Sequence, residues 1–466
     1  MNSTINSNGS NPHYPSVSDA ILTDNGAQDP IYPEVYPRLT DFKLGLTHSW
    51  TRGQPFDFFR RMREEAPVMW STMKKPSSGF WSVTRYDDVK QVELNPAIFS
   101  SQRGSMNMSI VANEAKKAER LINAAQNSLI NLDADVHREL RTHQAPFFFP
   151  KYVETLTQRI ENKVSELLDD LERQGPVVDF AKVFSSQLPL YTLCEMLGVD
   201  EEDRADIIDW MHFLELSSQF LSHPVRMLLS EPTFPFKFNG VLHDMFSYGE
   251  RVMRDRIANP REDLLTTIAN ATLREQPLSQ DYLDGSWLLI IFAGNDTTRN
   301  SLSGTIRLLT EFEEQRQRVL ADPSLIDRFS HEALRMVSPV MHMRRTAMAD
   351  TEIAGQRIAK DEKVIMWYGA ANRDPEVFPN PDVFDLTREN VDKHLAFGHG
   401  VHKCLGHRVA QLQLRIAYEQ ILKRFPKIHW TGKQKISPII LVHGIASLQV
   451  NLYGPGGKRP VQVGAR

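Results

Sequence analysis

The stretch FGHGVHKCLG, residues 397–406, is the most informative part of the sequence, because it places glycines on both sides of one cysteine, Cys404. Residues 407–424 follow it directly and have a helical pattern. Glycine lets the backbone fold tightly and direct amide N–H groups at the sulfur, and Gly406 leaves room for a flat cofactor to approach. A lone cysteine is most often a small buried hydrophobe, but this context favours a functional thiolate.

A thiolate held between glycines is typical of the axial ligand of a haem iron, where its electron donation favours cleavage of the O–O bond. The sequence therefore predicts that Cys404 binds haem iron. The only other cysteine, Cys194, is distant in the chain. Two separate cysteines are too few for a disulfide framework, and they indicate a reducing, cytoplasmic setting.

A second motif, AGNDTT at residues 293–298, interrupts a helical pattern that spans residues 281–311. The Thr297 hydroxyl can bond the carbonyl of Ala293, four residues earlier, which loosens the helix and leaves a groove for oxygen and water. Asp296 and Thr297 then form an acid and alcohol pair able to relay protons. Such a pair is usually solvated, but this one directly follows the most hydrophobic run of the chain.

A third motif places Glu332 and Arg335 three residues apart, on one face of a predicted helix. Most such pairs are weak surface ion pairs. Here Arg388 follows in the segment PDVFDLTR, residues 381–388. One carboxylate shared by two guanidinium groups would form a structural lock and not a catalytic site.

The overall composition excludes several classes of partner. The chain has 466 residues, of which 54 are basic and 58 acidic, so the net charge is −4. This balance argues against nucleic acid or an anionic membrane as the main partner. The first 30 residues lack both an apolar core and a basic lead-in, which argues against a signal peptide or membrane anchor. We expect a flexible arm at residues 1–40 and a single domain at residues 41–466.

Periodicity predicts a mainly α fold with a minor β region. The expected helices span residues 55–66, 151–172, 185–197, 201–221, 238–258, 281–311, 326–337 and 407–424, and the expected strands span residues 79–85, 364–368 and 439–452. Between two of these helices, residues 222–236 combine proline with aromatic residues. This segment is either a mobile lid or a buried connector.

The three motifs resemble those of the cytochrome P450 family in order and approximate spacing, over nearly the whole chain after the arm. The resemblance implies the P450 fold, haem b, and the use of O2 with two electrons. It also implies that Cys404 is the proximal ligand and that Asp296 and Thr297 are the acid and alcohol pair. Glu332, Arg335 and Arg388 would form the structural triad.

The same resemblance assigns four residues to the haem propionates. These are His137 and Arg141 in HRELR, Arg345 in MRRTA, and His402 beside the ligand. All four can neutralise or hydrogen-bond a carboxylate, although either histidine could instead be an ordinary core residue.

The sequence shows no flavin or nicotinamide domain, so we expect electrons from a separate ferredoxin and its reductase. A basic proximal face would attract an acidic ferredoxin. The residues expected there are His137, Arg138, Arg141, Lys403, His407 and Arg408. The alternative is that several of them only neutralise propionates and that the rest are solvated.

Several segments are similar to the bacterial branch that includes terminal hydroxylases of alkanes and fatty acids, and hydroxylases of acyclic terpenes and steroid side chains resemble the chain too. The resemblance places apolar residues in the distal pocket, which suits a hydrophobic substrate. They are residues 106–110, Leu289, Ile290, Ala293, Met341, Met343 and residues 439–441. Each of them could instead be an ordinary core residue.

Other activities remain open at this point. A terpene or steroid hydroxylase or an oxidative demethylase would use the same fold. A haem-thiolate peroxygenase would not need Asp296 and Thr297. A thiol hydrolase would lack a third residue to orient His402 or His407. A haem-binding sensor would have no use for the acid and alcohol pair.

Overall fold

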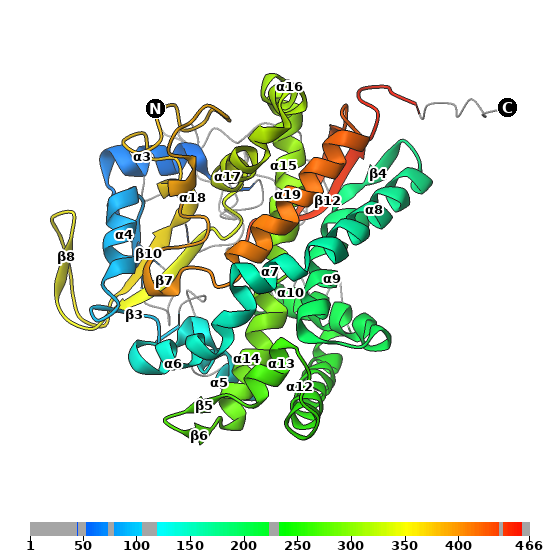
Figure 1. Cartoon of the computed structure of the whole chain (residues 1–466). Helices are drawn as coiled ribbons and strands as arrows, with labels where there is room; N and C mark the ends of the chain where they lie inside the picture. Colours follow the sequence, from blue (N-terminus) through cyan, green and yellow to red (C-terminus); the bar gives the residue numbers. More distant parts are fainter. Residues whose placement is uncertain are drawn as a thin grey trace.

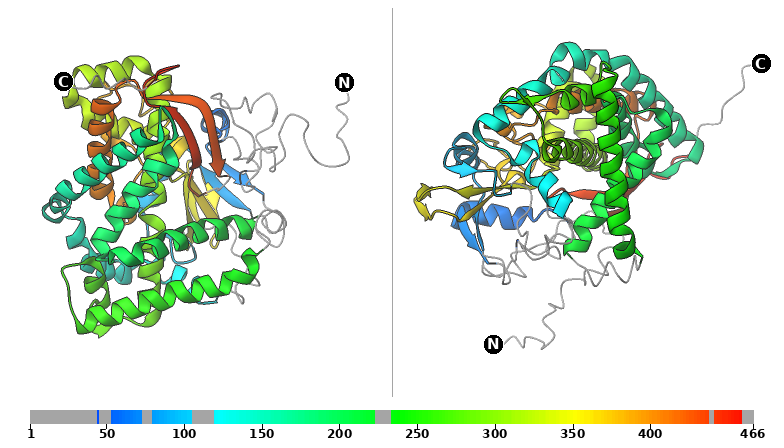
Figure 2. Two further views of the ribbon diagram at one scale, coloured as in Figure 1. Left: turned by 90° about the vertical axis from the view of Figure 1, so that its right-hand side faces the viewer. Right: turned by 90° about the horizontal axis from the view of Figure 1, so that it is seen from below.

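The structure is a computed structural model that describes residues 44, 53–72, 79–104, 119–222, 233–437 and 441–458. A five-stranded sheet, with strand order β1-β2-β10-β7-β3, lies beside the helical part of the molecule (Figures 1 and 2). Its strands are β1 (Val68–Ser71), β2 (Phe80–Val83), β3 (Phe99–Ser100), β7 (His342–Ala347) and β10 (Lys363–Trp367). Strand β10 runs parallel to β2 and antiparallel to β7, and its last four residues are buried, as expected for a central strand covered on both faces.

Three smaller sheets complete the β region. One is three-stranded, with order β11-β12-β4, and two are hairpins. Their strands are β4 (Val177–Asp179), β11 (His429–Ser437), β12 (Gly444–Asn451), β5 (Thr272–Leu273), β6 (Gln276–Pro277), β8 (Thr351–Ile353) and β9 (Gln356–Ile358).

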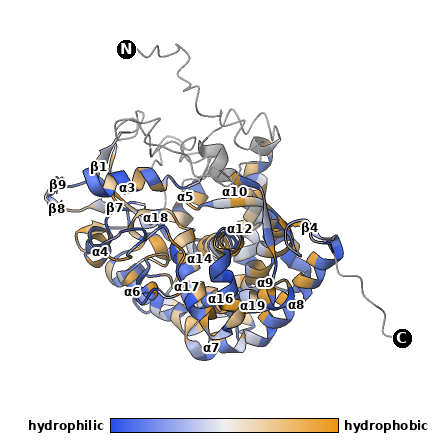
Figure 3. Cartoon of the chain, turned by 90° about the horizontal axis from the view of Figure 1, so that it is seen from above, coloured by the Kyte–Doolittle hydropathy of each residue, from blue (hydrophilic) through white to orange (hydrophobic). Residues whose placement is uncertain are grey.

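Helices make up most of the described chain, which confirms the predicted mainly α class. Those assigned as α-helix are α3 (Phe56–Glu65), α4 (Tyr86–Leu94), α5 (Glu119–Gln126), α6 (Ala134–Gln144), α7 (Pro150–Thr155), α8 (Thr157–Gln174), α9 (Gln187–Leu197), α10 (Arg204–Ser222), α12 (Phe234–Ala258), α13 (Leu264–Ala269), α14 (Gln280–Ala293), α15 (Asp296–Glu311), α16 (Glu313–Ala321), α17 (Ile326–Val337), α18 (Tyr368–Ala371) and α19 (His407–Arg424). Many helices near the surface carry both hydrophilic and hydrophobic residues, as expected of helices with one buried face (Figure 3). Within the described ranges, no helix is long and apolar enough to cross a membrane.

The main core forms where α8, α15, α17 and α19 meet. Tyr418 of α19 illustrates how tightly these helices are joined. Its buried ring lies 5.1 Å from that of Phe329 on α17, and its hydroxyl lies 2.7 Å from the Thr305 hydroxyl on α15. This core therefore fixes α19, which follows the Cys404 loop, against α15, which follows the acid and alcohol pair.

Several predicted helices differ in extent from those observed. The pattern at residues 151–172 belongs to two helices, α7 and α8, which separate at Leu156. Helix α9 begins at Gln187, after a π-helical turn at Ala181–Ser185. Helix α12 begins at Phe234, four residues earlier than predicted, because Pro235 is tolerated in a first helical turn.

The predicted 222–236 loop is therefore partly wrong, since its last residues are helical. Its central residues, 223–232, lie outside the described residues, as does the predicted 1–40 arm.

Of the strands that were missed, the two longest, β7 and β11, have sequences that do not read as strands. Strand β7 has the sequence HMRRTA, and its two arginines are buried, which periodicity cannot anticipate. Strand β11 is polar and irregular, with register shifts against β12 between Trp430 and Gln434 and between Lys435 and Ile436. The predicted 439–452 strand is shorter, because β12 begins at Gly444.

Candidate functional site

The loop that carries Cys404 closes on itself immediately before α19. The backbone N–H of Cys404 donates to the Phe397 carbonyl at 2.8 Å. Gly398 and Gly400 adopt φ values of 66° and 65°, a region that disfavours other residues. A Cβ atom on Gly400 would also lie 2.5 Å from the carbonyl oxygen of Glu93. Both glycines are therefore required by the shape of the loop.

The Cys404 side chain is exposed, yet enough protein surrounds it to affect its acidity. Desolvation raises the pKa of the thiol, while a hydrogen bond from the Gly406 amide and the charges of Arg141 and Lys403 act in the opposite direction. The structure thus shows the expected amide directed at the sulfur. A bound cation would have to complete the stabilisation of a thiolate here.

The space at Gly406 fits a group that approaches the sulfur. A Cβ atom at this position would lie 4.0 Å from the Cys404 sulfur and 3.9 Å from the Phe148 ring, which are ordinary contacts. The protein itself therefore does not require glycine at residue 406. A methyl group would instead occupy space next to the exposed thiol, where a flat cofactor would have to lie.

The four residues predicted to bind propionates come from three elements that meet beside this loop. His137 and Arg141 lie on α6, His402 precedes Cys404, and Arg345 lies on β7. The His137 and His402 rings are 4.3 Å apart between centroids, and the Arg141 guanidinium donates to the Lys403 carbonyl at 2.5 Å. The structure therefore brings α6 and the loop together directly.

His137 provides the clearest sign of a missing partner. Its side chain is buried, and its Nε2 atom has no hydrogen-bond partner among the described residues. Desolvation, reinforced by the charges of His402 and Arg141, lowers the pKa of His137 to about 3, so the ring is neutral at pH 7. Because buried polar atoms are nearly always paired, a carboxylate of a bound group would complete this site. The donor set therefore fits the propionates of haem.

Residues missed in the sequence hold this cluster in place. Asp133 accepts hydrogen bonds from the Ser100 hydroxyl and from the Ser101 amide, and His402 Nε2 lies 3.1 Å from the Ser101 hydroxyl. Although desolvation opposes it, hydrogen bonding to His402, Ser100 and backbone amides lowers the pKa of Asp133 to about 2. Asp133 directly precedes α6 but does not cap it, so a search for helix caps in the sequence would not have found this role.

The predicted 281–311 helix is two helices, α14 and α15, separated at Gly294 and Asn295. Thr297 donates to the Ala293 carbonyl at 3.3 Å, as predicted from the sequence. Asp296 lies 3.6 Å from the Arg299 guanidinium, and its carbonyl accepts from the Asn300 side chain at 2.7 Å. The helix is therefore interrupted at Gly294 and Asn295, although both residues keep right-handed helical backbone angles.

The residues predicted to line a distal pocket differ in how buried they are, and some lie outside the described residues. Leu289 and Ile290 are half-buried and pack against two separate core clusters, and Ala293 is exposed. Met343 is half-buried. Residues 106–110, 439 and 440 lie outside the described residues.

Met341 does not fit the predicted pocket. Its side chain is 1% exposed and packs in a core cluster that includes Phe58, Phe59 and Trp367. Its backbone is fixed from two directions, because its N–H donates to the Leu441 carbonyl and its own carbonyl accepts from Tyr368. Met341 is therefore a core residue.

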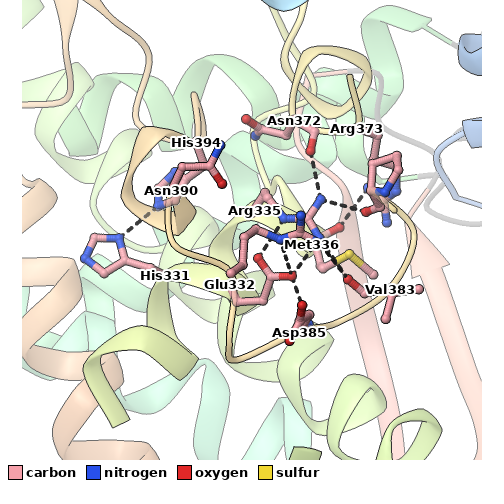
Figure 4. A network of polar contacts seen from close by, with 12 residues as sticks. His331, Glu332, Arg335, Met336, Asn372, Arg373, Val383, Asp385, Asn390 and His394 are labelled. Atoms are coloured by element: carbon pink, nitrogen blue, oxygen red, sulfur yellow. Dashed lines mark hydrogen bonds and ion pairs between the residues drawn. The ribbon is translucent and has the colours of Figure 1, made fainter. Parts of the chain in front are cut away.

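The predicted structural triad is present. Arg335 donates to both Glu332 oxygens at 2.7 and 2.8 Å, and Arg388 donates to Glu332 at 3.2 Å. Glu332 and Arg335 are fully buried. Figure 4 shows this pair surrounded by backbone groups of Asn372 and Asp385, so that the lock joins α17 to the segment before the Cys404 loop.

The predicted basic face is only partly a surface. Arg138, Lys403 and Arg408 are exposed, and Arg141 and His407 are half-buried. His137 is buried and cannot contact another protein, so its inclusion was wrong.

Comparisons with known proteins show the family that the motifs resemble. The profile of the cytochrome P450 family matches residues 42–445. The chain is 35% identical over 409 residues to linalool 8-monooxygenase of Pseudomonas putida, covering 86% of this chain and 97% of that one. It is 30% identical over 449 residues to the methyl-branched lipid omega-hydroxylase of Mycobacterium bovis, covering 93% and 99%. A Mycobacterium marinum cytochrome P450 in complex with pseudoionone superposes with a TM-score of 0.76 at 30% identity, covering 84% and 94%.

Proposed function

This chain belongs to the cytochrome P450 family and is a monooxygenase that uses haem b, and from that premise we propose that it hydroxylates an acyclic hydrophobic substrate with electrons from a separate ferredoxin. The observation that carries the proposal is the exposed Cys404 thiol, held in a glycine loop with an amide directed at its sulfur. Bound haem supplies the iron that activates O2. Holding the haem, delivering protons and contacting the substrate fall on residues of this chain.

In this proposal Cys404 ligates the iron, and the Gly406 amide stabilises the negative charge on the sulfur. Arg141 and Arg345 neutralise the propionates, while His137 and His402 donate hydrogen bonds to them. Desolvation lowers the pKa of both histidines, so each acts as a neutral donor.

We assign proton delivery to Asp296 and Thr297. The carboxyl of Asp296 takes up a proton, and the Thr297 hydroxyl passes it toward the oxygen site. The break between α14 and α15 supports this role, because it frees backbone groups that would otherwise be bonded within a continuous helix. A peroxygenase would not need such a pair, so we favour the O2-dependent reaction.

The substrate class rests on the apolar surface of α14 and on the relatives. Leu289, Ile290 and Ala293 offer no polar group that would orient a substrate through hydrogen bonds. The names of two relatives refer to linalool and to methyl-branched lipids, and a similar structure holds pseudoionone. A flexible terpene or lipid chain fits both observations, and a steroid or an oxidative demethylation is the alternative.

The decisive test is the absorbance spectrum of the reduced protein with carbon monoxide. We expect the red-shifted Soret band of a thiolate-ligated haem in the wild type and its complete loss in Cys404→Ala, because no other thiol lies in this loop. Cys194→Ala is the matched control, since Cys194 is buried on α9 and should leave the band unchanged. A band that survives in Cys404→Ala would refute the assignment.

The substrate proposal has its own test. Linalool, a fatty acid, an alkane and a steroid are added to the haem-loaded protein, and products are analysed after turnover under labelled O2 with a ferredoxin and its reductase. We expect one labelled oxygen atom in a hydroxylated acyclic product. Exclusive conversion of the steroid would overturn the acyclic class.

A further inference from the structure

A buried acid lies behind the arginine that is expected to bind a propionate. Glu93 is on α4, Arg345 on β7 and Tyr368 on α18, and each is 3% exposed. The Tyr368 hydroxyl donates to Glu93 Oε1, and a guanidinium nitrogen of Arg345 lies 3.6 Å from Glu93 Oε2. No feature of the sequence pointed to Glu93, and neither ligand binding nor proton delivery accounts for it.

We propose that Glu93 sets the reduction potential of the haem through Arg345, by sharing that guanidinium with a propionate; this inference rests on the proposed function. Glu93 acts through Arg345 and touches no reacting atom. The four residues assigned to the propionates are donors or cations, and Glu93 adds a carboxylate behind one of them, Arg345.

The surroundings of Glu93 favour the ionised carboxylate. A buried carboxylate is costly unless it is paired and hydrogen-bonded, and Glu93 has both a cation and a hydroxyl donor. Burial, followed by the charge of Glu93, raises the pKa of Tyr368 well above its ordinary value, so the phenol keeps its proton and donates. Glu93 therefore contributes a negative charge next to Arg345.

The charge of Glu93 changes the net charge around the propionate. With Glu93 ionised, the Arg345 guanidinium pairs with two acids, Glu93 and a propionate. The net charge of these three groups is −1. His137 does not offset the excess, because desolvation lowers its pKa to about 3 and leaves it neutral. Reduction adds an electron to the haem, and a buried negative charge disfavours that step. Removing the charge of Glu93 should therefore raise the reduction potential.

The carboxylate also lies against the Cys404 loop, so a structural role must be separated from an electrostatic one. A Cβ atom on Gly398 would lie 3.7 Å from Glu93 Oε1. The tightest contact of this helix with the loop, however, is between the Glu93 backbone carbonyl and Gly400. A change of the Glu93 side chain leaves that backbone contact in place.

The test is a potentiometric titration of the substrate-free haem protein, followed by absorbance. For Glu93→Gln we expect about a tenfold rise in the ratio of reduced to oxidised haem at a fixed solution potential, equivalent to about 59 mV for one electron. Glu93→Asp keeps the charge and should change the ratio much less.

The matched control is Glu362→Gln. Glu362 accepts a hydrogen bond from the Trp81 ring at 2.7 Å, so it too is a carboxylate bonded to an aromatic donor, but it lies at the start of β10 and forms no ion pair with Arg345 among the described contacts. If the reduction potential shifts as much in Glu362→Gln as in Glu93→Gln, the proposal is overturned.

Two further outcomes count against the proposal. An unchanged potential in Glu93→Gln that keeps the red-shifted carbon monoxide band would refute it and leave the monooxygenase assignment standing. If neither Glu93→Gln nor Glu93→Met retains haem, the carboxylate builds the site and does not tune it. A wild type without the red-shifted band would instead refute the proposed function itself.

Discussion

The loop that carries Cys404 and the turn that carries Asp296 and Thr297 are held in different ways. The loop is fixed by left-handed glycines and by the buried Glu332 lock before it. The turn is fixed by side-chain bonds to its own helix backbone, from Thr297 to Ala293 and from Asn300 to Asp296. Damage near the loop should therefore reduce stability and haem retention, whereas damage at the turn should affect chemistry alone.

The largest effect is expected at Glu332. Glu332→Gln leaves the buried guanidinium groups of Arg335 and Arg388 without their acid, which should cost about 3–5 kcal/mol of unfolding free energy. Glu311→Gln is the control, because its pair with Arg307 is partly exposed and should contribute about 0.3–0.5 kcal/mol. Equal urea midpoints for the two variants would show that the lock does not hold the loop.

The free energy of unfolding should also depend on pH, through His394 in the segment before the Cys404 loop. Burial, reinforced by His331 and Arg335, lowers the pKa of His394 to about 3 from 6.5. Below pH 6.5 the unfolded chain binds a proton that the folded chain does not, so stability falls as the pH drops from 6.5 to 3. The slope from this group is about 1.4 kcal/mol per pH unit. His394→Gln should flatten the curve of unfolding free energy against pH, and parallel curves would contradict this.

At the turn, Thr297→Ala should leave stability within about 1 kcal/mol, because one neutral hydrogen bond is lost. Loss of the hydroxyl should nonetheless reduce product per electron about tenfold or more and release hydrogen peroxide. Asp296→Asn should slow turnover. Thr142→Ala removes a similar bond, from Thr142 to the Arg138 carbonyl on α6, and should leave coupling unchanged. If Thr297→Ala forms as much product per electron as the wild type, the proton relay proposal is wrong.

The smallest effect concerns the surface outside the loop. Arg408→Glu should lower the rate supported by an acidic ferredoxin several-fold at low salt and hardly at all at 1 M salt, where the screening length is about 3 Å. Arg254→Glu, at an exposed position on α12, serves as the control. A rate that does not depend on ionic strength in either protein would argue against docking by charge.

Short motifs predicted local contacts better than they predicted the architecture. Cys404, the Thr297 bond to Ala293 and the Glu332 pair were all found from spacings within a few residues, where the chain itself imposes proximity. The break at Gly294 and Asn295 was underestimated, because a helix end depends on what packs against it. Strand β7 was missed because its buried arginines mimic a surface segment.

The sequence alone determined the family, the mainly α class and the position of the thiol, because a glycine loop around one cysteine leaves few conformations open. Only the tertiary structure decided that His137 is buried and neutral, that Met341 is a core residue, and that Glu93 pairs with Arg345. These three outcomes depend on neighbours 200 or more residues away in several cases, as Glu93 and Arg345 illustrate. Desolvation and long-range pairing arise only when the chain is folded, so no local pattern encodes them.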